Sequence, residues 1–153
     1  MYIDITKANP GRISVNPRDI FNLKSALMDS PDGRHVQTFD LGKKRTLSCV
    51  NISGMNEHVF WSKLNGRTAV CPLIERERLP EKSRTTKMTL VFSKKRGYII
   101  VIAAYYGPLT PRFPDSYDPG STERETAIEF WKSHALILGN KDKIELTTKP
   151  EWA

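Results

Sequence analysis

Residues 86–106, TKMTLVFSKKRGYIIVIAAYY, constrain the fold of this chain more than any other stretch. Met88, Leu90 and Phe92 alternate with Lys87, Thr89 and Ser93, which is the period of a strand with one solvated face. Residues 98–106 are apolar on both faces and rich in Ile and Val, as expected of a central strand. Lys94-Lys95-Arg96-Gly97 lies between them and has turn chemistry. The stretch therefore predicts a β-hairpin at the centre of a sheet.

The rest of the chain predicts helices and further strands. Asn16 and Pro17 are typical of a helix start, and Thr122 with Glu125 has the spacing of a capping box. Helices are expected over residues 17–29, 56–64 and 122–138, and strands over 35–41, 46–52, 68–74 and 144–148. This order predicts an α+β fold, in which a curved antiparallel sheet carries two to three helices on one face. We expect one domain over residues 1–153, with a helical N-terminal part (about 1–34) and a sheet core (about 35–153).

The positive charge is concentrated in one segment. Lys and Arg number 24 against 17 Asp and Glu, a net charge of +7. Residues 63–96 hold ten basic and three acidic residues, so the remainder of the chain is neutral. Such a segment favours a polyanionic partner, RNA above all, although a solvated basic face is the alternative. We expect six residues to contact nucleic acid: Arg76, Lys87, Lys94, Lys95, Arg96 and Arg112.

Several classes of site and location are not indicated. The two cysteines and three histidines do not have the spacing of metal ligands, so no metal is expected. The sequence has no glycine-rich phosphate loop, so no nucleotide cofactor is expected. No apolar run approaches the roughly 20 residues that a membrane span needs. The N-terminal sequence lacks the apolar stretch of a signal peptide. The expectation is a cytoplasmic protein without a membrane partner.

RNA cleavage without a metal ion needs a base for the 2′-hydroxyl, an acid for the leaving oxygen, and cations for the phosphorane. Histidine suits either proton role near neutral pH, and arginine suits the phosphate. His58 near Arg67 is one such combination, and His35 with Arg76 or Arg78 is another. For each of these two histidines, a purely structural role is the alternative.

Other side chains have supporting capacities. His134 lies on an apolar stripe and is predicted to be a hydrogen-bonded core residue. Tyr105, Tyr106 and Tyr117 are able to stack on bases, and Tyr105 and Tyr106 point to opposite faces of one strand. Thr110 and Arg112, in the proline-rich loop after that strand, are candidate phosphate contacts.

The segment YIIVIAAYYGPLTPRFP, followed by ERETAIEFWKSHALIL, resembles a group of small bacterial and phage proteins. In layout that group is similar to the barnase–EndoU–colicin–RelE superfamily of small metal-independent ribonucleases, many of them toxins. The resemblance covers about residues 46–138. It implies helices packed on a curved sheet, RNA on the exposed sheet face, and an antitoxin or other inhibitor protein as partner. The residues that would fill the superfamily's catalytic roles are His58, Arg67, Arg78, Tyr106 and Thr110.

Three functions stay open from the sequence. The first is a toxin-like ribonuclease that cleaves RNA by 2′-hydroxyl attack. The second is a non-catalytic module of a phage or mobile element that binds nucleic acid or protein, with salt-sensitive affinity for nucleic acid. The third is an enzyme for a small anionic metabolite, which needs an enclosed pocket near Pro108–Phe113.

Overall fold

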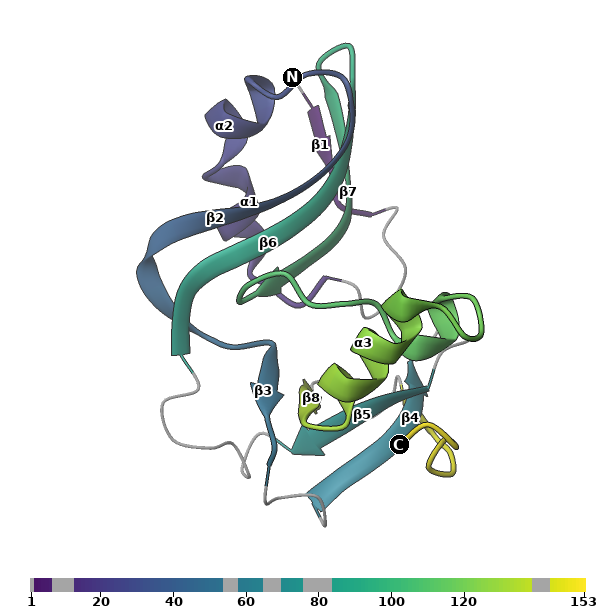
Figure 1. Cartoon of the computed structure of the whole chain (residues 1–153). Coiled ribbons are helices and arrows are strands. Elements are labelled where there is room, and N and C mark those ends of the chain that lie inside the picture. Colours follow the sequence, from purple (N-terminus) through teal and green to yellow (C-terminus); the bar gives the residue numbers. More distant parts are fainter. Residues whose placement is uncertain (1, 7–12, 54–57, 65–69, 76–83, 139–143) are drawn as a thin grey trace. The chain divides into compact units, whose positions relative to one another are not determined.

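The computed structural model describes residues 2–6, 13–53, 58–64, 70–75, 84–138 and 144–153 (Figure 1). The chain divides into two compact units, and each is built from two separate segments. Unit 1 consists of residues 1–47 and 84–109, and unit 2 consists of residues 48–83 and 110–153. These boundaries differ from the expected helical N-terminal part and sheet core, because each unit has helical and strand segments of its own.

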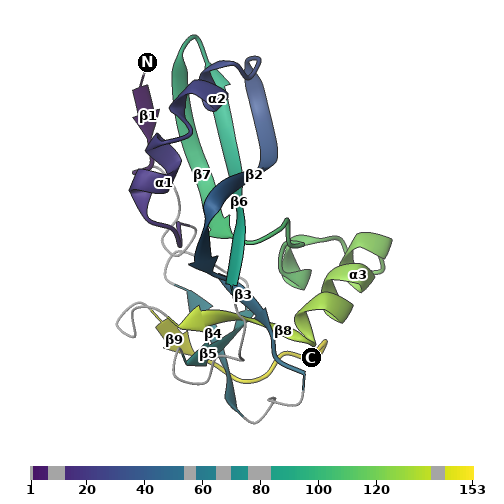
Figure 2. The same cartoon turned by 90° about the vertical axis from the view of Figure 1, so that its left-hand side faces the viewer.

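Unit 1 is a four-stranded sheet with two short helices (Figure 2). Its elements are β1 (Tyr2–Asp4), α1 (Pro17–Phe21), α2 (Lys24–Met28), β2 (Gly33–Thr46), β6 (Arg84–Lys95) and β7 (Tyr98–Tyr106). The strand order is β1-β7-β6-β2, with β1 parallel to β7 and the other pairs antiparallel. The hairpin predicted from the sequence is thus confirmed as β6 and β7, and both are inner strands.

The core of unit 1 lies between this sheet and its helices. Met88, Leu90 and Phe92 of β6 are fully buried and pack with Ile20 of α1 and Leu27 of α2. Their alternation in sequence follows the pleat of the strand, so one face of β6 supplies the core. The helical segment predicted over 17–29 is present, but as two short helices.

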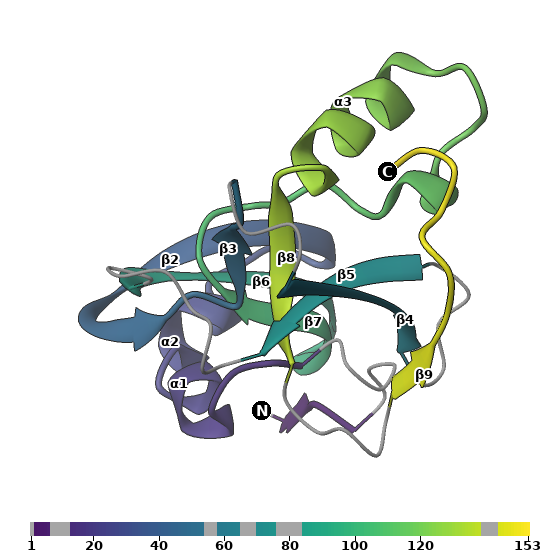
Figure 3. The ribbon, with the colours of Figure 1, turned by 90° about the horizontal axis from the view of Figure 1, so that it is seen from below.

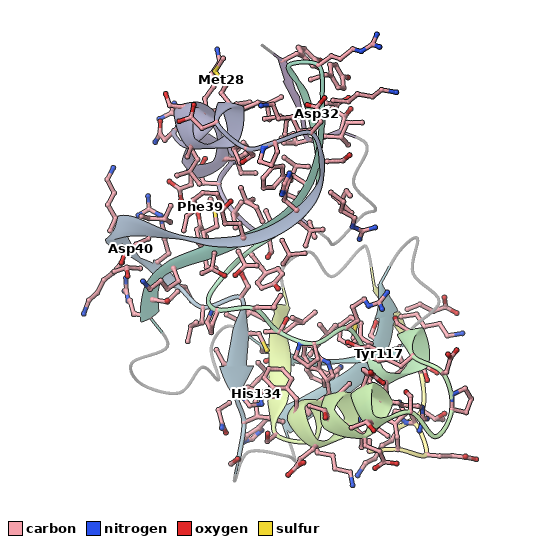
Figure 4. The ribbon with its side chains drawn as sticks, turned by 45° about the horizontal axis from the view of Figure 1, so that its top comes forward. Met28, Asp32, Phe39, Asp40, Tyr117 and His134 are labelled. Atoms are coloured by element: carbon pink, nitrogen blue, oxygen red, sulfur yellow. The ribbon has the colours of Figure 1, made fainter. Side chains whose placement is uncertain are left out.

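The start of the first helix also follows the sequence prediction. The side-chain oxygen of Asn16 accepts a hydrogen bond of 3.0 Å from the Arg18 amide, and Pro17 is the first helical residue. The apolar residues of this helical segment are only partly buried, because Phe21 and Met28 are exposed; Figure 4 shows Met28 on α2.

Unit 2 is a five-stranded sheet with one α-helix (Figure 3). Its elements are β3 (Cys49–Asn51), β4 (Val59–Leu64), β5 (Val70–Glu75), the 3₁₀ helix η3 (Pro114–Ser116), α3 (Thr122–Trp131), β8 (His134–Leu138) and β9 (Ile144–Leu146). The order is β3-β8-β5-β4-β9, with β5 and β8 parallel and the other pairs antiparallel. Ala127 and Trp131 of α3 pack on Cys71 and Leu73 of β5.

The predicted α+β class is therefore confirmed, whereas the prediction of a single curved antiparallel sheet is wrong. The described residues form two mixed sheets, and the helices are shared between them rather than gathered on one face. Parallel pairs such as β1–β7 join segments far apart in sequence, and no local pattern specifies them.

Parts of two segments that were predicted to be helical form strands instead. Residues 59–64 form β4, and α3 ends at Trp131, after which residues 134–138 form β8 between β3 and β5. The periodicity of a short apolar run fits a helix or a strand equally well, and here hydrogen bonding to neighbouring strands makes both segments strands. The cap of α3 is also one residue earlier than predicted, because the Ser121 hydroxyl accepts from the Arg124 amide at 3.2 Å.

The strands predicted over 35–41 and 46–52 have different bounds. β2 runs from Gly33 to Thr46 without interruption and includes the Lys43-Lys44-Arg45 segment. Its register against β6 shifts between Asp40 and Arg45, where Gly42 has a positive φ of 70°. A bulge at a glycine lets one long strand continue where the sequence suggested a break.

Candidate nucleic-acid interface

One end of the unit 1 sheet gathers aromatic and basic side chains. We call it the hairpin-tip surface, and it consists of Tyr2, Arg34, Lys95, Arg96 and Tyr98. Tyr2 is the cross-strand partner of Tyr98, and Lys95 is the partner of Tyr98 on its other side. Arg34 pairs with Ser93, two residues before Lys95, so it lies on the same face. The sheet register therefore places these residues together from three separate parts of the chain.

The two tyrosines of this surface form an ordered, accessible aromatic pair. Their ring centroids are 5.1 Å apart with an interplanar angle of 20°. Tyr2 is 58% exposed and Tyr98 is 37% exposed. The Tyr98 hydroxyl donates to Asp4 Oδ2 at 3.0 Å, and partial burial together with this carboxylate raises the pKa of Tyr98. The pair is held in place at neutral pH and keeps ring surface for a ligand.

The turn of the hairpin fixes where its two cations project. Arg96 and Gly97 both have positive φ, 49° and 78°, as a two-residue type I′ turn requires. Lys95 is the last residue of β6, so the positive segment 94–97 is half strand and half turn. Lys95 and Arg96 are exposed, as is Arg34. Asp32, also exposed and labelled in Figure 4, reduces the positive charge of this end of the unit.

The lysines predicted to bind nucleic acid do not form one patch. Lys94 points to the opposite face of β6, where its ammonium donates to the Met28 carbonyl and, at 2.6 Å, to the Ser30 carbonyl at the end of α2. Lys87 lies at the other end of β6 and pairs with Asp40 at 3.1 Å. Figure 4 shows Asp40 well away from Asp32, the residue that precedes the start of β2. Of the predicted set, as far as the structure describes it, only Lys95 and Arg96 share the hairpin-tip surface.

Tyr106, a predicted catalytic residue, belongs to a buried network in unit 1. Its hydroxyl donates to Asp19 Oδ2 at 2.5 Å and accepts from the Asn16 amide at 3.0 Å. Arg45 Nε and Nη2 donate to the same carboxylate at 2.9 and 3.1 Å. The bidentate Arg45 contact, and then the Tyr106 hydrogen bond, lower the pKa of Asp19. Burial and the Asp19 carboxylate raise the pKa of Tyr106, which favours the protonated hydroxyl that donates to Asp19.

The other predicted site residues that the structure describes lie in unit 2. His58 and Thr110 are partly buried there, and Arg112 is exposed. The Arg112 guanidinium lies 5.0 Å from the ring centroid of Tyr117, whose hydroxyl accepts from the Arg112 amide at 3.0 Å. The predictions for Arg67, Arg76 and Arg78 concern positions outside the described residues.

Two histidines have structural contacts. His35 Nε2 is 2.6 Å from the Pro31 carbonyl, and its ring packs on Phe92 at 5.1 Å. His134 Nδ1 is 2.9 Å from the Phe130 carbonyl, and its ring stacks on the Phe130 ring at 3.9 Å (Figure 4). The hydrogen bond predicted for His134 is confirmed, but the residue is only partly buried, and it begins β8 instead of continuing the helix.

Sequence reasoning missed Tyr2, Arg34 and the binding capacity of Tyr98. Alternation within residues 2–4 was the available signal, but it does not reveal that β1 is the parallel neighbour of β7. Long-range pairing created the surface.

The described segments show neither a metal-binding cluster nor a membrane-spanning helix. No group of three His, Cys, Asp or Glu side chains lies close enough there to hold a metal ion. No helix among the described residues has the length and apolar character to cross a bilayer.

The fold and this surface define a two-unit α+β protein with an aromatic and basic sheet end. No family model matches the chain, and no curated protein matches it. Its fold is similar to that of a conserved hypothetical protein from Toxoplasma gondii ME49, known from a crystal structure, with a TM-score of 0.51 and 11% sequence identity. The match covers 88% of this chain and 94% of the other. At this identity the likeness concerns the fold alone.

Proposed function

We propose that this protein binds single-stranded RNA through the hairpin-tip surface. The observation that carries the proposal is the stacked, exposed pair Tyr2–Tyr98 beside Lys95. Bases of a single strand stack on aromatic side chains with little regard to sequence, and neighbouring cations hold the phosphates. The net charge of +7 favours the encounter with a polyanion.

The arrangement favours single strands over duplexes. Stacking on Tyr2 or Tyr98 requires an unpaired base face, which an intact duplex hides. Arg34, Lys95 and Arg96 are exposed at the same end of the sheet. Few phosphate contacts predict moderate affinity and a shallow dependence on salt.

Fluorescence anisotropy with a labelled single-stranded RNA, repeated over a range of salt concentrations, tests the proposal. Tyr98→Ala should weaken binding about tenfold, since stacking contributes about 1–3 kcal/mol per base. Lys95→Ala should also lower the slope of log affinity against log salt by about 1. Lys43→Ala, an exposed lysine elsewhere in unit 1, is the matched control. Equal effects of Lys43→Ala and Lys95→Ala, together with full affinity of Tyr98→Ala, would exclude the hairpin-tip surface.

RNA cleavage by a metal-independent, toxin-like mechanism is a second proposal. The observation that favours it is the placement of His58, Thr110 and Arg112 in one unit, with a histidine, a hydroxyl and a cation as the mechanism requires. An inhibitor protein would then restrain the activity in the cell. Incubation with total RNA in excess chelator should yield 2′,3′-cyclic phosphate ends that His58→Ala abolishes. Intact RNA that is still retarded in a gel would leave the binding function without cleavage.

A further inference from the structure

Unit 2 contains a pocket of about 330 Å³ that none of the functions above uses. Its lining combines apolar and aromatic side chains with two lysines: Ile52, Val59, Trp61, Trp131, Lys132, Lys149 and Ala153. The volume lies at the lower end of the range typical of small-molecule sites, about 300–1,000 Å³. All seven residues belong to unit 2, so the pocket is complete within one compact unit.

The aromatic walls of the pocket are fixed by their own contacts. Trp131 is 2% exposed, and its indole N–H donates to the Arg112 carbonyl at 3.2 Å. Trp61 meets Trp152 edge-on, with ring centroids 5.4 Å apart and an interplanar angle of 81°. Rigid indoles lose little conformational entropy when a flat ligand packs against them. The pocket is therefore preorganised for a planar aromatic group.

The polar features of the pocket point to an anionic ligand with acceptor atoms. Lys132 and Lys149 line it while remaining exposed, and ammonium groups so placed attract a phosphate.

We propose that this pocket binds a nucleoside monophosphate, with the base against Trp61 and the phosphate on Lys132 and Lys149. The ligand is either a free nucleotide or one nucleotide of an RNA strand. Both present the same flat ring and the same charge. The proposal does not depend on the hairpin-tip surface, which belongs to unit 1.

Intrinsic fluorescence is a direct reporter of binding. The chain has three tryptophans, of which Trp61 and Trp131 line the pocket and Trp152 packs on Trp61. Titration of the full chain with AMP should quench and saturate this emission, after correction with a parallel titration of free tryptophan. Adenosine should bind about a hundredfold more weakly than AMP, since it lacks the phosphate that both lysines contact.

Variants connect that signal to the pocket. Lys132→Ala and Lys149→Ala should each weaken AMP binding about tenfold while leaving adenosine binding unchanged. Val59→Phe should fill the pocket and abolish binding of both ligands. Lys43→Ala, an exposed lysine of unit 1 outside both proposed binding surfaces, removes the same charge and should bind AMP as the parent chain does. Thermal unfolding of each variant confirms that it is folded.

Two results would overturn the proposal. One is the absence of saturable quenching by AMP at millimolar concentration, a range in which weak sites still bind. The other is equal affinity of the parent, Val59→Phe and both lysine variants for AMP.

A single-stranded oligoadenylate distinguishes the two sources of the ligand. If it competes with AMP only in chains that retain Lys132 and Lys149, the pocket accepts a nucleotide within RNA; if it does not compete, the ligand is a free nucleotide.

Discussion

At the scale of single residues, Tyr106 shows how the tertiary environment changes a side chain's expected role. The sequence predicts a catalytic or base-stacking tyrosine, whereas the structure places its hydroxyl between Asp19 and the Asn16 amide. That hydrogen bond joins β7 to the start of α1, and Arg45 adds β2 to the same carboxylate. The network holds helix and sheet of unit 1 together.

Tyr106→Phe should therefore destabilise the protein rather than alter its affinity for RNA. Removing one hydrogen bond to a buried charged group should lower the free energy of unfolding by about 1–3 kcal/mol. Chemical denaturation measures this change. Tyr2→Phe is the matched control, because Tyr2 is 58% exposed, and it should change stability little. If Tyr106→Phe kept full stability but cleaved RNA more slowly, the result would instead support the predicted catalytic role of Tyr106.

Asp19 predicts how stability depends on pH. Its pKa is lowered in the folded state, chiefly by the Arg45 hydrogen bonds, so its contribution is complete at neutral pH and is lost as pH falls through the folded pKa. In Asp19→Asn the free energy of unfolding should be lower at neutral pH and should fall less steeply below about pH 4. Denaturation series at several pH values give both quantities. If the free energy of unfolding changed with pH in the same way in the parent and in Asp19→Asn, the Asp19 carboxylate would not be the cause of the pH dependence.

At the scale of elements, the hairpin β6–β7 depends on its turn as well as on its apolar alternation. Gly97 has φ = 78°, and a Cβ built on it meets no atom within 4 Å, so substitution there is opposed by backbone strain alone. Gly97→Ala should lower the free energy of unfolding by about 1–2 kcal/mol. Lys95→Ala, two residues away in regular strand geometry, is the control for the loss of a side chain beside the turn. Equal stability of Gly97→Ala and the parent would contradict the type I′ geometry.

At the scale of the whole molecule, the chain enters unit 2 and returns to unit 1 at neighbouring positions. Thr46 and Arg84 are cross-strand partners in the β2–β6 ladder. A two-residue Asn-Gly turn in place of residues 47–83, in a chain that ends at residue 109, should give a cooperatively folding unit 1. Circular dichroism and thermal unfolding measure this, and RNA anisotropy shows whether the hairpin-tip surface survives. An unfolded product would mean that unit 1 requires unit 2 for stability.

Local sequence patterns determined the features of this protein that depend on near neighbours. The alternation over 86–93 and the turn at Arg96-Gly97 specified the hairpin, and Asn16-Pro17 specified the start of α1. The α+β class followed from the order of such elements. Backbone periodicity, caps and turn residues act over a few positions, so they can be read from the chain directly.

Only the tertiary structure decided the division into two sheets and the composition of the candidate sites. Residues 134–138 continue an apolar stripe, yet they form β8 because β3 and β5 supply hydrogen bonds on both sides. Tyr2 became a neighbour of Tyr98 through parallel pairing, and Lys94 was drawn to the end of α2. Strand partners come from distant segments, and the free energy of pairing outweighs local preference, so these outcomes depend on the whole fold.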